Sequence, residues 1–146
     1  LMSDSTFKIK MDLQYNHSFG ELLPYFEALG GGRAMARRCN NCGRVWFPPH
    51  AACPEDGSLC EWVELDGTGL VIAITKTRSR LPFTDDYADH IFLMVAMSGA
   101  DNAAFGELIA TDAIAAPGDR VCLVKKPAYY SHPVQTATFK VLEGDG

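Results

Sequence analysis

Two similar turns rich in cysteine, at residues 39–43 and 53–57, limit what this chain can fold into more than any other feature. The first reads Cys39-Asn-Asn-Cys42-Gly43 and the second Cys53-Pro-Glu-Asp56-Gly57. Ligands at positions i and i+3 of a tight turn can face one ion, and the glycine that follows can adopt the positive φ that such a turn needs. Paired turns of this kind are typical of structural zinc sites. We therefore expect a zinc ribbon here.

The expected ligands of this zinc are three cysteines and one aspartate: Cys39, Cys42, Cys53 and Asp56. The fourth position is open, because a carboxylate stands where a thiolate is usual. Asp56 occupies the repeated position, and carboxylate is an accepted zinc ligand. Cys60 is an alternative fourth ligand, a softer donor that requires a longer loop, and His50 is a third candidate. The ribbon can also be one that has lost its metal and is held by the packing of Trp46, Phe47 and Trp62.

The metal is expected to be structural rather than catalytic. A catalytic zinc needs a bound water and a general base, and no glutamate and histidine lie near the cluster at a spacing that indicates such a base. No residue of the chain is predicted to be catalytic.

The part before the ribbon is predicted to be a helical arm. Residues 1–17 are polar and mixed, and we expect them to be poorly ordered unless a partner holds them. Ser18-Phe-Gly-Glu21 has the form of a capping box. Apolar residues spaced like one helical face follow it, up to the glycines at 30–32, and predict an amphipathic helix. This helix either packs on its own domain or offers its apolar face to a partner.

The part after the ribbon is predicted to be a five-stranded barrel. Apolar and β-branched runs predict strands at 70–80, 90–97, 103–110, 119–126 and 137–142. Turn residues separate them and no long helix intervenes, which is typical of an OB-fold. The predicted fold class is thus mainly β, with an N-terminal arm (residues 1–32), a zinc-ribbon module (33–62) and an OB-fold (63–146).

Charge and hydropathy exclude several classes of function. The chain of 146 residues has a net charge of -5, whereas a protein that binds the nucleic-acid backbone needs a basic field. No apolar run approaches the roughly 20 residues that span a bilayer, so no membrane partner is expected. The N-terminal residues lack the pattern of a secretion signal, and the five cysteines are an odd number. We expect a cytoplasmic protein without a disulfide framework.

An ordered set of short motifs resembles one known family. The motifs are Tyr25-Phe-Glu-Ala-Leu29, Arg38-Cys-x-x-Cys-Gly-Arg44, Phe47-Pro-Pro49, Cys53-Pro54 and Trp62-Val-Glu-Leu-x-Gly-x-Gly69. Over residues 20–142 the chain resembles small acyl-CoA-associated proteins that join a helical arm, a rubredoxin-like zinc ribbon and an OB-fold, a group long described as a domain of unknown function. In this resemblance Cys39, Cys42 and Cys53 match zinc positions, whereas Asp56 replaces a cysteine.

The resemblance implies a non-catalytic accessory subunit. Such proteins partner thiolase-like enzymes that make or break carbon–carbon bonds in acyl-CoA substrates. The thiolase-like chain supplies the catalytic groups, and the ribbon-plus-barrel chain docks on it and helps to form the CoA channel. The partners implied here are therefore a thiolase-like subunit and acyl-CoA.

Three basic residues at alternate positions, Lys76, Arg78 and Arg80, are the candidate CoA contacts. Alternate residues of a strand project from one face, where these side chains can pair with the phosphates of CoA or form a solvated edge. The alternative function is single-stranded nucleic-acid binding by an OB-fold, which stacks bases on aromatic rings. The rings available for it are Phe83, Tyr87, Phe92, Phe105, Tyr129 and Tyr130.

Overall fold

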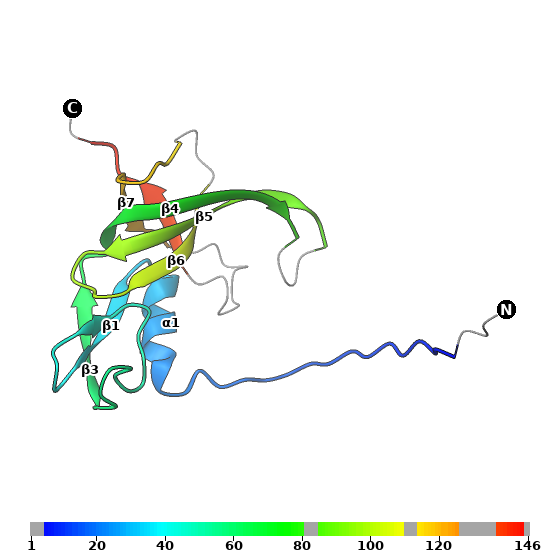
Figure 1. The fold of residues 1–146 in the computed structure, drawn as a ribbon, viewed down its shortest axis with the longest axis horizontal. Coiled ribbons are helices and arrows are strands. Elements are labelled where there is room, and N and C mark those ends of the chain that lie inside the picture. Colours follow the sequence, from blue (N-terminus) through cyan, green and yellow to red (C-terminus); the bar gives the residue numbers. More distant parts are fainter. Residues whose placement is uncertain (1–4, 81–84, 110–113, 126–136, 145–146) are drawn as a thin grey trace.

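A computed structural model describes residues 5–80, 85–109, 114–125 and 137–144. These residues form a short N-terminal helical arm, a three-stranded ribbon sheet and a closed five-stranded barrel (Figure 1). The predicted fold class is confirmed. Neither helix of the described residues has the length or the apolar character needed to cross a membrane.

The arm consists of a 3-10 turn, η1 (Gly20–Leu22), followed by the helix α1 (Leu23–Gly30). The predicted capping box is wrong, because the Ser18 hydroxyl accepts a hydrogen bond from the N–H of Gly20 (3.1 Å) outside the α-helix. Pro24 explains the difference: it has no N–H to donate and is accommodated in the first turn, so the α-helix begins at Leu23. The helix buries Tyr25, Ala28 and Leu29 and so packs on its own domain.

The ribbon sheet has the strand order β2-β1-β3. Its strands are β1 (Ala34–Cys39), β2 (Val45–Trp46) and β3 (Cys60–Leu65). β1 pairs antiparallel with β3 from Ala34 opposite Leu65 to Cys39 opposite Cys60. The sheet thus continues to Leu65, beyond the predicted end of the ribbon at residue 62, because the pairing register carries β3 along the whole of β1.

The barrel closes in the order β4-β5-β6-β8-β7. Its strands are β4 (Thr68–Ser79), β5 (Ala88–Met97), β6 (Ala103–Leu108), β7 (Arg120–Leu123) and β8 (Thr138–Val141). All the pairs are antiparallel except β6 with β8. Each strand lies within two residues of its predicted start, although the predicted ends at Ala110 and Lys126 fall outside the described residues. Gly106 is required where β6 crosses Phe139, because a Cβ there would lie 2.4 Å from the ring.

One hydrophobic core joins the arm, the ribbon and the barrel. Its buried members include Tyr25 and Leu29 of the arm, Phe47 of the ribbon, and Leu93 and Phe139 of the barrel. Hydrogen bonds reinforce the junction at the start of β2. The N–H of Asp101 donates to the carbonyl of Val45 (2.8 Å), and the N–H of Val45 donates to the Asp101 carboxylate (2.8 Å). The ribbon is therefore fixed against the barrel.

Candidate metal centre

The two cysteine turns have the same backbone geometry. The N–H of Gly43 donates to the carbonyl of Cys39 (3.1 Å), and the N–H of Gly57 donates to the carbonyl of Cys53 (2.8 Å). Both glycines have positive φ, of 75° and 73°, where glycine meets no Cβ penalty. The N–H groups of Cys39 and Cys53 also bond to the carbonyls five residues on, at 2.8 and 2.9 Å. The repeat in the sequence is therefore a repeat of structure, and each turn presents its first and fourth side chains alike.

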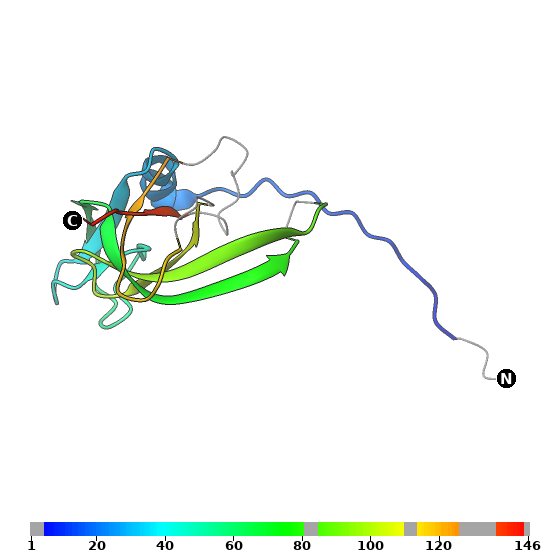
Figure 2. The ribbon, with the colours of Figure 1, turned by 90° about the horizontal axis from the view of Figure 1, so that it is seen from above.

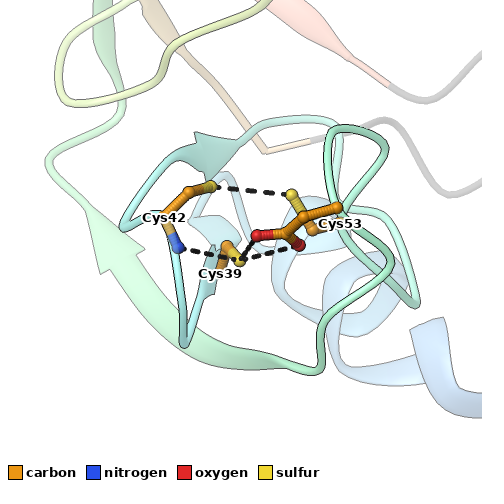
Figure 3. Close-up of side chains that lie close together, drawn as sticks. Cys39, Cys42 and Cys53 are labelled. Atoms are coloured by element: carbon orange, nitrogen blue, oxygen red, sulfur yellow. Dashed lines mark hydrogen bonds between the residues drawn. The ribbon is translucent and has the colours of Figure 1, made fainter.

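The two turns bring one donor atom each from Cys39, Cys42, Cys53 and Asp56 within 4.8 Å of one another. Figure 3 shows the three cysteines pointing toward a common centre. The sulfurs of Cys42 and Cys53 are 3.7 Å apart, and the sulfur of Cys39 is 3.5 Å from the nearer Asp56 oxygen. Ligands of one tetrahedral zinc would have an S–S separation of about 3.8 Å and an S–O separation of about 3.6 Å. The separations therefore fit one zinc ion.

The other two candidate ligands lie outside this group. Cys60 is buried in β3, and its thiol is directed to the carbonyl of Ser58 at 3.8 Å. His50 is exposed and places its ring edge against Trp46, with centroids 5.4 Å apart. The geometry thus favours Asp56 over Cys60 and His50 as the fourth ligand, although the ligand set itself stays a prediction.

Hydrogen bonds prepare Asp56 to act as an anionic ligand. The Asn41 side-chain amide donates to one carboxylate oxygen (2.9 Å), and the backbone N–H of Ser58 donates to the other (2.9 Å). These bonds, with that from Asn41 the stronger, hold the pKa of Asp56 well below its usual range. Neither Asn41 nor Ser58 was predicted from the sequence as a supporting residue. The Asp-x-Ser spacing is a known turn signal, whereas Asn41 is remote in sequence and carries no such signal.

The surroundings shift the pKa values of the Cys39 and Cys42 thiols in opposite directions. Burial opposes ionisation of Cys39, but the backbone N–H groups of Cys42 and Asn41, each 3.4 Å from its sulfur, lower its pKa. The N–H of Arg44 lowers the pKa of Cys42, yet burial and the neighbouring thiols outweigh it and raise that pKa to about 11. Thiols packed this closely resist joint ionisation, and a cation between them would offset that resistance.

The donor set is consistent with structural zinc. Three thiolates and one carboxylate supply a full tetrahedron, whereas catalytic zinc sites keep one position for water. Cys39 and Cys53 are buried with Trp46 and Cys60 in a small second core, whereas Cys42 and Asp56 are exposed. The centre can thus cross-link the two turns and needs no additional ligand.

The candidate CoA contacts lie away from this centre, on the hairpin of β4 and β5. Lys76 and Arg78 line a surface depression of about 390 Å³, together with Asp89 and His90 of the opposite strand. Arg78 is 3.3 Å from the Asp89 carboxylate, with both side chains largely exposed. Arg80 follows the end of β4 and is not among the residues that line the depression. Two of the three basic residues therefore share one surface feature.

The aromatic residues do not form one continuous platform in the described part of the chain. Phe92 and Phe105 stack on each other with centroids 5.3 Å apart, and Tyr87 is exposed. His90 stacks on Phe92 and is 2.7 Å from Glu107, which places an acidic side chain beside the rings. Phe83, Tyr129 and Tyr130 lie outside the described residues.

Comparison with known proteins identifies the ribbon and the overall architecture. Residues 26–61 match the family described as ChsH2, rubredoxin-like zinc ribbon domain. The chain is similar to a solved structure described as "Ltp2-ChsH2(DUF35) aldolase", with 24% identity and a TM-score of 0.62 over 87% of this chain and 98% of that one. It is also similar to a DUF35 family protein of unknown function from Sulfolobus solfataricus, with 14% identity and a TM-score of 0.58 over 81% of this chain and 82% of that one. No curated protein matches the sequence.

These findings confirm the resemblance that the motifs indicated. The zinc ribbon is identified by its sequence, and the combination of arm, ribbon and barrel is identified by its fold.

Proposed function

We propose that this chain is a non-catalytic accessory subunit that docks on a thiolase-like enzyme and helps it to bind or channel acyl-CoA. The observation that carries the proposal is the match over 98% of a chain whose description joins Ltp2 and ChsH2 in one aldolase. A chain with the same architecture can have the same role in an enzyme complex, and this support is an analogy of fold. The motifs of the arm and ribbon point to the same acyl-CoA-associated group.

The closed metal centre supports the non-catalytic part of the proposal. We propose Cys39, Cys42, Cys53 and Asp56 as the ligands, and zinc held by all four has no open position for a substrate or a water. Zinc bound there would stabilise the two turns, and these turns carry β2 and the buried Phe47 against the barrel. Its role is thus to keep the docking body rigid.

The acyl-CoA part of the proposal rests on the basic end of the β4–β5 hairpin. Lys76 and Arg78 line the depression there, and Arg80 lies two residues after Arg78 in the chain. Phosphate oxygens of CoA would pair with these side chains, and for Arg78 this would mean exchanging the exposed partner Asp89. Exposed ion pairs contribute little to stability, so such an exchange costs little.

The proposal is tested by recovering the tagged full-length chain from its native host and identifying the co-purifying proteins by mass spectrometry. A thiolase-like chain at near-equal stoichiometry, absent from a tag-only control, is the expected result. Recovery of no such enzyme would refute the accessory role. Nucleic acid recovered instead, and released by salt, would establish the alternative function of single-strand binding.

The CoA contact is tested separately on the recovered complex. Replacing Lys76 and Arg78 by Gln is expected to weaken acyl-CoA binding and to raise its KM without changing complex formation. Lys140→Gln, which removes an exposed lysine from β8, is the matched control. Equal KM values for the unmodified complex, the variant with both Lys76 and Arg78 replaced, and the Lys140→Gln control would assign the basic residues to a solvated edge.

A further inference from the structure

The segment before the arm helix has a regular pattern that its mixed composition conceals. Apolar side chains occupy every second position from residue 7 to residue 15, and polar ones occupy the positions between. The apolar set is Phe7, Ile9, Met11, Leu13 and Tyr15, with exposed fractions of 63% to 83%. Strict alternation is typical of a β-strand with one buried face, yet here the face meets solvent.

Nothing in the described part of the chain covers this face. None of the five side chains belongs to either core cluster, and residues 7–15 form neither a strand nor a backbone hydrogen bond to another described segment. Figures 1 and 2 show from two directions that the segment leads away from the folded body. The arm helix, by contrast, has already buried Tyr25 and Leu29 in its own domain. The free apolar surface of the N-terminal arm is therefore concentrated in this segment.

The backbone of residues 7–15 is suited to strand pairing. The segment contains no glycine and no proline, so every residue offers an N–H donor and a carbonyl acceptor. Nine extended residues span about 30 Å, which lies within the usual range of strand lengths. An extended peptide of this kind gains main-chain hydrogen bonds at a free sheet edge, and its alternate side chains select the edge.

We propose that residues 7–15 dock as an added β-strand on a free sheet edge of the partner enzyme, with the five apolar side chains against an apolar surface of that enzyme. The inference rests on the proposed function, because the enzyme of the accessory complex is the partner. It assigns a main contact to this segment rather than to the already buried face of α1.

The charges of the segment describe the partner edge and bear on whether the segment can pair with a second copy of this chain. Lys8 and Lys10 lie on the polar face, and no ion pair joins either to another described residue. A complementary edge carries aspartate or glutamate at this end. In this chain, residues 73–79 of β4 pair with β5 alone among the described strands. This part of β4 has one free edge and carries Lys76 and Arg78. Like charges would oppose its pairing with the segment. The outer strand β3 carries Glu61 and Glu64, but Arg38 and Arg33 of this chain already pair with them, and the homodimer outcome of the test below covers this edge.

The inference is tested with full-length variants that change one face at a time. Ile9→Ser with Leu13→Ser removes apolar contacts, and Gln14→Ser with Asn16→Ser is the matched, uncharged change on the other face. We expect the first pair to weaken binding to the enzyme identified above by at least about tenfold, and the control pair to leave it within about twofold. Lys8→Glu with Lys10→Glu is expected to weaken binding more at low salt than at high salt. Equal binding by all the variants would overturn the inference while the recovered complex still supports the accessory role.

Two further measurements distinguish strand addition from other roles. Hydrogen exchange at the amides of residues 7–15 is expected to slow when the enzyme is added, and unchanged exchange would overturn the inference. The melting temperature of the isolated Ile9→Ser/Leu13→Ser variant is expected to equal that of the parent, since the segment touches neither core. A lowered melting temperature, or a homodimer that this variant dissociates, would assign the segment to the chain itself or to a second copy. Failure to recover any enzyme with the unmodified chain would refute the accessory role itself.

Discussion

Replacing Asp56 by Asn tests the proposed metal centre at its least usual position. The change keeps the size of the side chain and an acceptor oxygen, but it removes the negative charge that Asn41 and Ser58 stabilise. We therefore expect the zinc affinity to fall while the fold of the barrel stays intact.

The size of the effect follows from the number of ligands. Structural zinc in small ribbon-like peptides binds with about 10–16 kcal/mol at neutral pH. An equal share for one of four ligands is about 2.5–4 kcal/mol, which corresponds to roughly a hundredfold to a thousandfold in affinity. Asp56→Cys is expected to keep the zinc, because it restores a thiolate set. Cys60→Ser is expected to leave the affinity within about threefold, because that thiol is directed to the carbonyl of Ser58.

The assay is competition with a chromogenic zinc chelator, with total zinc per chain measured by mass spectrometry. Loss of zinc in Cys60→Ser but not in Asp56→Asn would make Cys60 the fourth ligand and show that the two turns do not supply equivalent ligand pairs. If neither variant loses affinity, the fourth position is not supplied by either side chain.

Three further outcomes concern stability. Leu29→Ala is expected to destabilise the chain by about 2–5 kcal/mol in urea unfolding, because Leu29 lies in the shared core. Leu23→Ala, at an exposed position of the same helix, is expected to cost far less. Equal losses of stability in the two variants would disprove the shared core. Gly106→Ala is expected to cost about 1–3 kcal/mol, since its Cβ would overlap a ring and a carbonyl; an unchanged urea midpoint would contradict this packing. The N–H of Thr68, and then its hydroxyl, lower the pKa of Asp66, so the stabilisation by Asp66 is present above its unfolded pKa and is lost as the pH falls through the folded pKa. The stability difference between the parent and Asp66→Asn should accordingly shrink in acid, and a constant difference across the titration would be evidence against it.

The sequence predicted features that depend on neighbours along the chain. The turns at Cys39 and Cys53 each close within five residues, so their geometry could be read from the spacing alone. The strands of the barrel were likewise visible as β-branched and apolar runs. The capping box failed because Pro24, just beyond it, decides where α-helical hydrogen bonding can begin.

Features that depend on distant segments were not accessible in the same way. The bond from Asn41 to Asp56 joins different turns, and the choice between Asp56 and Cys60 depends on where β3 directs its side chains. The alternation from Phe7 to Tyr15 was present in the sequence, but a pattern does not tell whether a strand of the same chain will cover it. Only the fold shows that this face is left open.

The continuous core has a consequence for how the molecule unfolds. Tyr25, Phe47 and Phe139 belong to one buried cluster although they come from the arm, the ribbon and the barrel. Regions that share a core tend to unfold as one cooperative unit, so we expect a single transition rather than a ribbon that melts ahead of the barrel. A shortened protein that begins after the ribbon would expose the barrel face on which Phe47 packs. The zinc ribbon is thus not an independent module, because its Phe47 is buried in the same cluster as the apolar side chains of the barrel.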